Sequence, residues 1–541
     1  MKRIAWIVGT VIAVLVLLLI ALPFVVDVNS FRPKIETELS SALGRKVKIG
    51  NLKLSLLSGS VTADNLSISD DPAFSRSSFV RAKALHVGVE VLPLVFSKTL
   101  HVTNLTLDQP EIVLLRSTSG RWNFSSLGAN APKQEHTKSD SSFAQNLSVN
   151  RLNVKNGQIA IGKANAPGKN TKYQNVNISV RNFSFSSSFP FTLSADLPGG
   201  GSLKLDGTAG PINPDDAAAT PLQAQINVKS LNVAATGFVE PSSGIGGLAD
   251  FEGTLKSDGH QAQSSGTLTA NKLKLSPKGS PADVPVVVKY AVEHNLQTQT
   301  GRLTRGDVSI GKALAQLTGG FQIQGDSTPL NMKLAAQSMP VDDLEAMLPA
   351  LGVILPSGSS LKGGTLSTNL AISGPVDKLV ITGPIHLADT KLAGFNLGSK
   401  LSAISALSGA KTGSDTVIQN FSTDAHATPG GIETQNVNLN IPTLGVVTGS
   451  GTISPDGALD YKMSASFSGT SVGGITQLVG MGSKGGSIPF FIRGTTSNPS
   501  FVPDVKGMLS NEFKLPGAGN GQTPQNNVVN SISGLFGKKK K

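Results

Sequence analysis

Apolar and polar residues alternate one by one along most of the chain. The alternation is clear in residues 51–56 and 65–69, resumes at residue 143 and continues to about residue 490. Because successive side chains of a strand point to opposite faces, this period of two predicts strands with one apolar and one polar face. Gly, Asn, Asp or Pro recur between these stretches at a spacing of roughly 8–12 residues, as expected for the turns of an antiparallel sheet.

Alternation over about 350 residues predicts a mainly β protein with a large apolar sheet face that must be covered. A compact sandwich covers such a face with a second sheet. A sheet curled along its length instead leaves an apolar trough that something else fills. The alternation by itself is compatible with both arrangements.

At the N-terminus the pattern is an unbroken apolar run, residues 4–26, in which Thr10 is the only polar side chain. As a helix this run would be about 34 Å long, enough to cross a hydrocarbon core of about 30 Å. Lys2 and Arg3 precede it, so the positive-inside rule places the N-terminus in the cytoplasm and the bulk of the chain beyond the membrane. A cleaved signal peptide has the same basic start, but its apolar part is shorter, about 7–15 residues, and ends at small residues. We therefore predict a retained single-pass anchor.

Three short amphipathic helices are predicted besides the anchor. Residues 27–30 offer capping side chains to a first helix, which Gly44 ends. Apolar residues at helical spacing predict a second helix over residues 340–351, with two aspartates at its N-terminal end. A third is indicated around residues 401–407.

These patterns divide the chain into five parts. They are a cytoplasmic stub with the transmembrane anchor (1–26), an N-terminal module of one helix and several strands (27–127), a polar linker or loop (128–142), a repetitive antiparallel β region (143–510) and a flexible tail with a basic end (511–541).

Composition narrows the possible functions. The chain has no cysteine, which excludes disulfides, thiolate nucleophiles and cysteine-based metal sites. Its net charge of +12 comes without a basic patch interleaved with aromatic residues, so we expect anionic lipid rather than nucleic acid to be attracted.

Two kinds of catalytic motif are approached but not completed. Residues 469–473 fit G-x-S-x-G, yet the histidine of such a triad follows the serine, and the last histidine here is His426. Residues 157–164 and 306–313 resemble each other and approach a phosphate-binding loop, but both place alanine where the magnesium-binding hydroxyl belongs. We interpret the first as a turn and the other two as strand and turn.

The remaining titratable residues are scattered. The seven histidines show no metal-binding spacing. The adjacent pairs Asp215–Asp216 and Asp342–Asp343 are interpreted as turn or cap residues, because neighbours on a strand face opposite ways. We predict no catalytic residue, no cofactor and no metal site.

An ordered set of short motifs resembles the AsmA family of bacterial envelope proteins. The motifs, in chain order after the anchor, are Val26-Asp27, Phe31-Arg32-Pro33, Leu43-Gly44-Arg45-Lys46-Val47, Leu52 with Leu54-Ser55, Leu66-Ser67-Ile68, Leu105-Thr106-Leu107-Asp108-Gln109-Pro110-Glu111-Ile112, Gly120-Arg121-Trp122-Asn123-Phe124, Gly363-Gly364-Thr365-Leu366, Ile372-Ser373-Gly374-Pro375 and the segment from Ile488 to Asp504. The resemblance extends over nearly all of residues 20–506.

The resemblance implies a long curved antiparallel sheet with an apolar groove, related to bridge-like lipid-transfer proteins. It implies an inner-membrane protein with most of its chain in the periplasm, which acts in outer-membrane biogenesis by shielding phospholipid acyl chains. A non-catalytic scaffold or assembly factor for outer-membrane proteins fits the composition equally well. An envelope hydrolase is the weakest alternative, because no usable triad or metal set is present.

Two sets of residues are candidates for contact with lipid. Groove candidates from the alternating set are Leu152, Val154, Val176 and Ile178. In the tail, an amphipathic segment precedes four lysines, a pattern typical of contact with an anionic membrane. The tail candidates are Ile532, Leu535, Phe536, Lys538, Lys539, Lys540 and Lys541. A solvated, frayed terminus is the alternative for the tail, because so short a helix is marginal in water. Expected partners are phospholipid acyl chains, the inner membrane through residues 4–26 and other envelope proteins.

Overall fold

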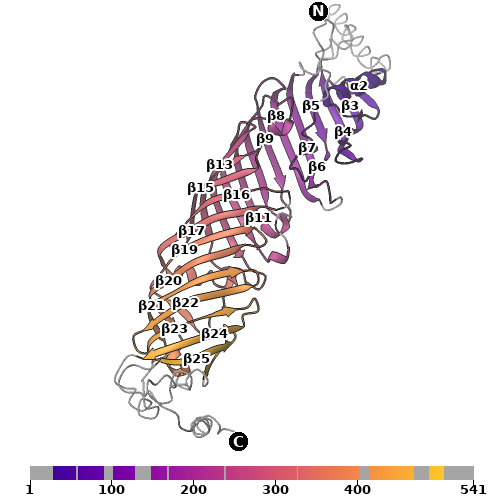
Figure 1. Cartoon of the computed structure of the whole chain (residues 1–541). Coiled ribbons are helices and arrows are strands. Elements are labelled where there is room, and N and C mark those ends of the chain that lie inside the picture. The colour runs from indigo at the N-terminus through magenta and orange to yellow at the C-terminus, as the bar shows by residue number, and fades with distance from the viewer. Residues whose placement is uncertain are drawn as a thin grey trace, which may run out of the picture.

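The computed structural model describes residues 28–55, 59–90, 102–127, 148–166, 170–236, 239, 241–325, 327–401, 413–467 and 487–504. Within these ranges the chain forms one elongated body, in which strands stack in succession from the N-terminal to the C-terminal end (Figure 1). All 26 described strands belong to a single sheet, so the prediction of a mainly β protein is confirmed. No helix in these ranges has the length and apolarity needed to cross a membrane, and the anchor predicted at residues 4–26 lies outside them.

The chain enters the sheet through a short helical segment. A 3-10 turn η1 (Val28–Phe31) leads into helix α2 (Arg32–Leu43), which has a proline in its first turn. Gly44 ends the helix in the left-handed conformation, with φ of 63°, as predicted. The N-cap residue of α2 is Phe31, whose side chain makes no cap, and Asp27 of the predicted capping residues lies outside the described ranges. Asn29 accepts the Leu52 N–H at 2.9 Å and donates to the Leu52 carbonyl at 3.3 Å. This residue therefore connects the helical segment to the first strands.

Six strands make up the N-terminal part of the sheet. They are β1 (Val47–Lys48), β2 (Leu52–Ser55), β3 (Ser60–Ser69), β4 (Ser78–Val89), β5 (Val102–Asp108) and β6 (Glu111–Arg116). β1 and β2 lie end to end along β3, and β5 and β6 lie end to end along β4.

The next strand, β7 (Ser148–Lys163), pairs in parallel with β5 and β6, and these are the only parallel pairings among the described strands. Asn104 of β5 lies opposite Arg151, and the same offset continues to the end of β6. A parallel neighbour needs a crossover of a dozen or more residues, and residues 117–147 supply it. The linker predicted at residues 128–142 falls within this crossover, outside the described residues.

From β7 onward the strands form an antiparallel meander. They are β8 (Thr171–Ser184), β9 (Phe189–Asp196), β10 (Ser202–Ala209), β11 (Leu222–Asn232), β12 (Gly246–Ser257), β13 (Gln261–Lys274), β14 (Val286–Asn295), β15 (Thr300–Ile310), β16 (Ala313–Gln322), β17 (Pro329–Pro340), β18 (Ser360–Lys362), β19 (Thr365–Pro375), β20 (Val380–Ala393), β21 (Thr416–Thr428), β22 (Gly431–Ile441), β23 (Gly445–Ile453), β24 (Leu459–Phe467), β25 (Ser487–Gly494) and β26 (Pro499–Pro503). β18 and β19 lie end to end along β20. With three such end-to-end pairs, the 26 strands form 23 successive rungs, or about 105 Å of sheet at about 4.8 Å per rung before twist.

The longest strands contain residues that the alternation alone would place at strand ends. In β8 the apolar positions run through Val180 and resume at Phe183, three residues later. Asn182 lies between them with φ of 51°, and the strand continues through it. The register with β7 is unchanged across Asn182, because Val149 and Leu152, which are also three residues apart, lie opposite Phe183 and Val180. The two strands therefore shift their alternation together, which returns the following apolar side chains to the same face.

Residues in the left-handed conformation recur along the described sheet. Nine non-glycine residues inside strands have φ between 49° and 53°: Asn65, Asn156, Asn175, Asn182, Ser230, Lys272, Ser338, Asp389 and Asn436. The pairing register shifts at six of them, which makes β-bulges that bend the strand and increase its twist: Asn156, Asn175, Ser230, Lys272, Ser338 and Asn436. At three of them the neighbouring strand supplies a side-chain acceptor for the backbone N–H. Asn156 N–H donates to Asn177 Oδ1 at 3.1 Å, Ser230 N–H to Asp250 Oδ1 at 2.8 Å and Ser338 N–H to Ser367 Oγ at 2.9 Å. The bulges are thus specific features held by the next strand.

Short helical segments connect some of the strands without interrupting the sheet. The helix predicted over residues 340–351 is split into α4 (Val341–Glu345) and the 3-10 turn η5 (Pro349–Leu351). The third predicted helix begins earlier than expected, as α5 (Leu397–Leu401), and residues 402–412 lie outside the described ranges. Three further 3-10 turns are η2 (Ala217–Ala219), η3 (Val233–Thr236) and η4 (Pro241–Ser243).

A buried polar network holds the N-terminal part together. The Arg45 side chain is only 5% exposed, and its guanidinium lies 3.6 Å from Asp70 and 3.5 Å from Asp71. Arg45 Nη2 donates to the Asn123 carbonyl at 2.8 Å and to Ser126 Oγ at 2.7 Å. The network therefore joins the end of α2, the β3–β4 turn and the loop after β6.

The two carboxyls of this network differ in their environment. Burial raises the pKa of Asp70, against a hydrogen bond from Asn123 and the charge of Arg45. Burial acts in the same direction on Asp71, but hydrogen bonds from Ser126 and the Ala73 N–H, together with Arg45, hold the pKa of Asp71 below its usual value.

Replacing the bulge residue Ser230 tests whether its left-handed conformation is required. Ser230→Val should destabilise the β11–β12 region by about 1–2 kcal/mol, because a β-branched residue is strained at positive φ. Ser230→Gly, which keeps the conformation, should leave stability nearly unchanged. Hydrogen exchange of the β11 and β12 amides measures both effects, and equal exchange in the two variants would contradict the assignment.

Removing the cation tests the buried network. Arg45→Met should destabilise the N-terminal part by about 3–5 kcal/mol, because two carboxyls are left without their partner. The folded-state pKa of both carboxyls then rises, so the folded state binds protons more tightly than the unfolded chain and the loss should be smaller at pH 5 than at pH 7. Urea unfolding followed by the fluorescence of Trp122 measures this.

Adding Asp70→Asn to Arg45→Met provides the control, since it removes one of the unpaired charges. The double variant should recover part of the lost stability at pH 7. A loss in Arg45→Met that does not change with pH would show that packing, rather than charge, holds this junction.

The apolar face of the sheet as the candidate functional site

The pairing register joins apolar positions of successive strands into a continuous row. Directly opposed residues of neighbouring strands point to the same face. Starting at Leu54 and moving one strand at a time, the opposed residues are Leu54, Val61, Val87, Leu105, Leu152, Val180, Phe191, Gly207, Ala224, Leu255, Ser264, Val292, Leu303, Gly319, Met332, Ile372, Ile381, Ala427, Ile432, Ile453 and Leu459. We call this the Leu54 row, and Ser264 is its single polar member.

A second row runs beside the first on the same face. Its members are Leu52, Ala63, Leu85, Leu107, Val154, Ile178, Leu193, Leu205, Ile226, Gly253, Gly266, Tyr290 and Gly306, and, beyond a bulge, Leu317, Leu334 and Leu370. It resumes as Gly383, Ala425, Thr434, Gly451, Tyr461, Ile492 and Phe501. We call this the Leu52 row, and neither row contains a charged residue.

The opposite face has the opposite character. Between the two rows along each strand lie residues that point the other way, and their row is polar from the first strands to the centre of the sheet. It contains Lys53, Thr62, His86, Thr106, Asn153, Ser179, Thr192, Asp206, Gln225, Thr254 and Ser265. The sheet therefore has one continuous apolar face, which is the candidate functional site.

Large side chains lie over glycines on this face. A Cβ at Gly451 would collide with the ring of Tyr461 on the next strand, and a Cβ at Gly301 would collide with the ring of Phe321. Glycine inside a strand permits such close approach and marks bends of the sheet. These positions keep the face smooth, since an aromatic ring covers the gap that the missing side chain leaves.

The four groove candidates lie on the apolar face, but they differ in access. Leu152 and Ile178 are half-buried, whereas Val154 is 5% exposed and Val176 is fully buried. Val176 lies opposite Gly157 at the Asn156 bulge, where the local twist closes the strands around it. Only the first two can be reached from outside in this structure.

Coverage of the apolar face is local. At the N-terminal end, Ile35, Leu39 and Leu43 of α2 pack on the buried cluster around Leu52 and Leu85. At the C-terminal end, Leu397 of α5 packs on a cluster that includes Phe490. Near the centre, Met347 and Ala350 of the α4–η5 segment pack against the ends of β13 and β14. Because all described strands form one sheet, no second sheet within the described ranges covers the remainder.

Three tyrosines provide the only phenol groups of the chain, and all lie on the apolar face. Burial raises the pKa of Tyr173, Tyr290 and Tyr461, as expected for hydroxyls in apolar surroundings. The hydroxyl oxygen of Tyr290 lies 2.9 Å from Ser264 Oγ, and the hydroxyl oxygen of Tyr461 lies 3.0 Å from Thr434 Oγ1. Alternation did not identify these pairs, because each joins residues of different strands.

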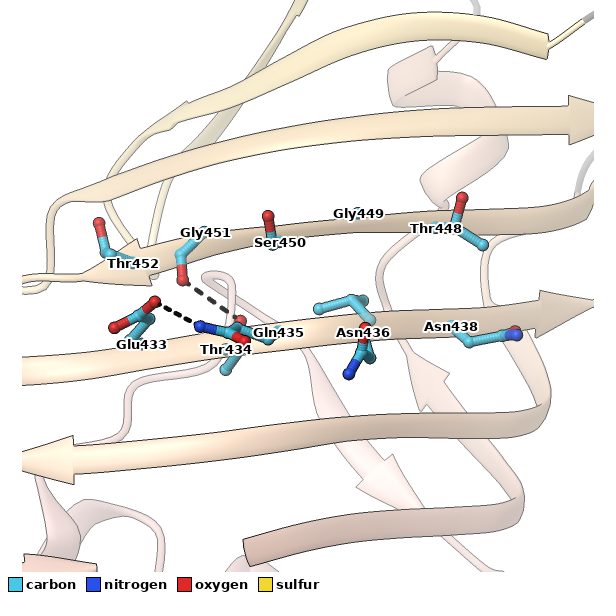
Figure 2. A pocket seen from close by; sticks show the side chains of 11 residues that line it. Glu433, Thr434, Gln435, Asn436, Asn438, Thr448, Gly449, Ser450, Gly451 and Thr452 are labelled. Atoms are coloured by element: carbon cyan, nitrogen blue, oxygen red, sulfur yellow. Dashed lines mark hydrogen bonds between the residues drawn. The ribbon is translucent and has the colours of Figure 1, made fainter. Parts of the chain in front are cut away.

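Two hollows lie along the sheet. One, of about 850 Å³, extends across β10 to β15 and is lined by residues that include Ala224, Leu255 and Ser264. The other, of about 730 Å³, lies between β22 and β23 at the Asn436 bulge. Figure 2 shows its polar rim, where Gln435 donates to Glu433 at 2.9 Å and Thr434 lies beside the Gly451 carbonyl. The bulge accounts for this second hollow, since it pushes two residues out of the ladder.

The motif interpretations can be compared with the structure. Residues 306–313 form the end of β15, a turn and the start of β16, and residues 157–164 lie in and just after β7, so strand and turn are confirmed. The cap role is confirmed for Asp216, which accepts the Ala218 N–H at the start of η2. Asp342 and Asp343 instead lie in the first turn of α4, which has no side-chain cap, and accept the N–H groups of Gly363 and Lys312. In the described part of the chain no group of three or more His, Asp or Glu could hold a metal ion. Residues 469–473 and the tail candidates lie outside the described ranges.

Comparison with known proteins adds one match. The model of the AsmA family matches residues 1–280, about half of the chain. Searches of curated proteins and of solved structures returned no significant match.

The assignment of the two faces can be measured directly. The chain lacks cysteine, so single-cysteine variants carry one label each. A polarity-sensitive dye on Ile178→Cys should emit at shorter wavelength than the same dye on Ser179→Cys, because adjacent residues of β8 face opposite sides. Leu152→Cys and Asn153→Cys should repeat the difference on β7, and equal emission within both pairs would refute the assignment.

Proposed function

Because this chain belongs to the AsmA family, we propose that its apolar face forms a groove that shields phospholipid acyl chains and passes lipid between the two membranes of a bacterial envelope. The observation that carries the proposal is the Leu54 row, which is apolar or glycine at every rung from β2 to β24 except Ser264. A row interrupted by charges would stop an acyl chain, whereas this one offers contacts of similar kind throughout.

The energetics suit movement rather than tight binding. Each buried CH₂ contributes about 0.8 kcal/mol, and a chain that shifts by one rung loses and regains similar contacts. Half-buried residues such as Leu152 and Ile178 keep the face accessible, while headgroups stay in water at the rim. No catalytic step is required, and lipid identity depends on contacts alone.

The placement in the cell is part of the same proposal. Residues 4–26 anchor the chain in the inner membrane, and the remainder extends into the periplasm. The described sheet then contributes about 105 Å of path. The tail after residue 511 carries the apolar and lysine residues that would contact a membrane or an envelope partner.

The far edge of the sheet favours lipid passage over a scaffold that works by strand pairing. β26 is a five-residue strand with proline at both ends. Proline has no N–H to donate, and short proline-bearing edges discourage the addition of a further strand. A scaffold built on edge pairing needs a longer, unblocked edge.

A charge on the apolar face tests the proposed function. Ile178→Asp should stay folded and reduce the lipid that copurifies with the full chain by about tenfold, because an unpaired carboxylate would have to be desolvated by the acyl chain. Ser179→Asp, one residue away on the polar face, is the matched control and should retain lipid. Mass spectrometry of extracted lipid measures both.

Val176→Asp places the same charge at a sealed position and should destabilise the fold instead. If Ile178→Asp also fails to fold, the apolar face is a closed core of the kind a sandwich has. If Ile178→Asp folds and retains lipid as Ser179→Asp does, acyl chains do not pass over this position.

A further inference from the structure

The centre of the apolar face contains a pair of hydroxyls that packing alone does not require. Ser264 is the only polar member of the Leu54 row, and Tyr290 belongs to the neighbouring Leu52 row. They are diagonal neighbours across β13 and β14, and their oxygens lie 2.9 Å apart. Tyr290 is also stacked on Phe251, with ring centroids 5.7 Å apart. The phenol is thus held in place by an aromatic neighbour and a hydroxyl partner.

A similar pair lies farther along the same face. Two hydroxyls joined by one hydrogen bond use one O–H and leave the other as a free donor. At the second pair Thr434 Oγ1 donates to the Tyr461 hydroxyl at 3.0 Å and also lies 3.4 Å from the Gly451 carbonyl, so the Tyr461 O–H is the one left over. In the Ser264–Tyr290 pair either hydroxyl can be the donor, so either one can offer the remaining proton.

A free donor on an apolar face calls for an acceptor. Within an acyl lipid the acceptors nearest the hydrocarbon are the ester carbonyls at the top of the chains. A fatty-acid carboxylate would also accept, but it brings a charge, and neither row holds a cation to meet it. Ser264 also borders the hollow of about 850 Å³ across β10 to β15, which provides space beside the pair.

We propose that the Ser264–Tyr290 pair is a selection point in the groove, which donates a hydrogen bond to an ester carbonyl of a diacylglycerol-based lipid as it passes. This inference rests on the proposed function and names the residues that discriminate between lipids. The pair favours ester-linked lipids over molecules that have the same chains without carbonyls. It does so near the middle of the sheet, about 40 Å from the pair at Thr434.

The test compares two lipids that differ only at the carbonyl. The full chain in detergent is mixed with equal amounts of dioleoyl phosphatidylethanolamine and its dioleyl ether analogue, repurified, and the bound lipids are quantified by mass spectrometry. The wild-type chain should favour the ester by about three- to tenfold, the value of one hydrogen bond. The double variant Ser264→Ala/Tyr290→Phe should bring the ratio toward one, whereas either substitution alone leaves one hydroxyl as a donor.

Two matched variants serve as controls. Tyr461→Phe removes the remaining donor of the second pair and should leave the ratio at its wild-type value, because the selection point is assigned to the centre of the sheet. Thr254→Val removes a hydroxyl from the polar face of β12, where Thr254 lies 3.2 Å from Ser265 Oγ, and should also leave it unchanged. Thermal unfolding of each variant checks that folding is preserved.

The outcomes separate the two proposals. If lipid is bound but the wild-type ratio is one, or if the double variant keeps the preference, the selection point is refuted and the groove stands. If Tyr461→Phe removes the preference as fully as the double variant, selection lies at the second pair and the assignment falls. If oleate added in equal amount displaces the ester lipid, the ligand is the carboxylate instead. If no lipid binds, the proposed function itself fails, and the selection point with it.

Discussion

Cross-strand register is the constraint on which the rest of this structure depends. A strand places alternate side chains on alternate faces, so a slip of one residue between two neighbours would turn every later side chain to the other face. Across 23 rungs such a slip would divide the apolar face into unconnected patches. The Leu54 row shows that the register is kept from β2 to β24. Its continuity is a property of the whole sheet, because each pairing contributes one step.

The bulges make this register compatible with curvature. A sheet that curls along its length needs strands that bend, and an extra residue in the left-handed conformation bends a strand. The same extra residue shifts the alternation by one, so the sequence must shift its apolar pattern at the same place. At Ser230, between Val228 and Leu231, the two shifts coincide. Curvature and a single apolar face are therefore obtained together, and the side chains of the next strand hold the bulge at Ser230.

A different constraint applies to the N-terminal part, where the sheet begins. β7 pairs in parallel with β5 and β6, so the chain must cross over before the antiparallel meander begins. The network of Arg45, Asp70 and Asn123 lies where the strands before the crossover meet the loop that leads into it. In the proposed groove this end is also the one nearest the membrane anchor, and α2 covers the apolar face there. The start of the sheet is thus both the most polar in its interior and the most completely covered.

Local pattern by itself determined the fold class, the first helix with its Gly44 end and the position of β19, and short ordered motifs indicated the family. It identified Leu152, Val154, Val176 and Ile178 as apolar strand residues, but it could not tell that Val176 is sealed and Ile178 accessible. It treated the stretches on either side of Asn182 as separate, where the structure has one strand. The parallel pairing of β7, the buried Arg45 network and the Ser264–Tyr290 pair were decided only by the tertiary structure. The physical reason is that alternation is a property of one strand, whereas register, burial and contact belong to pairs of strands that are far apart in the chain.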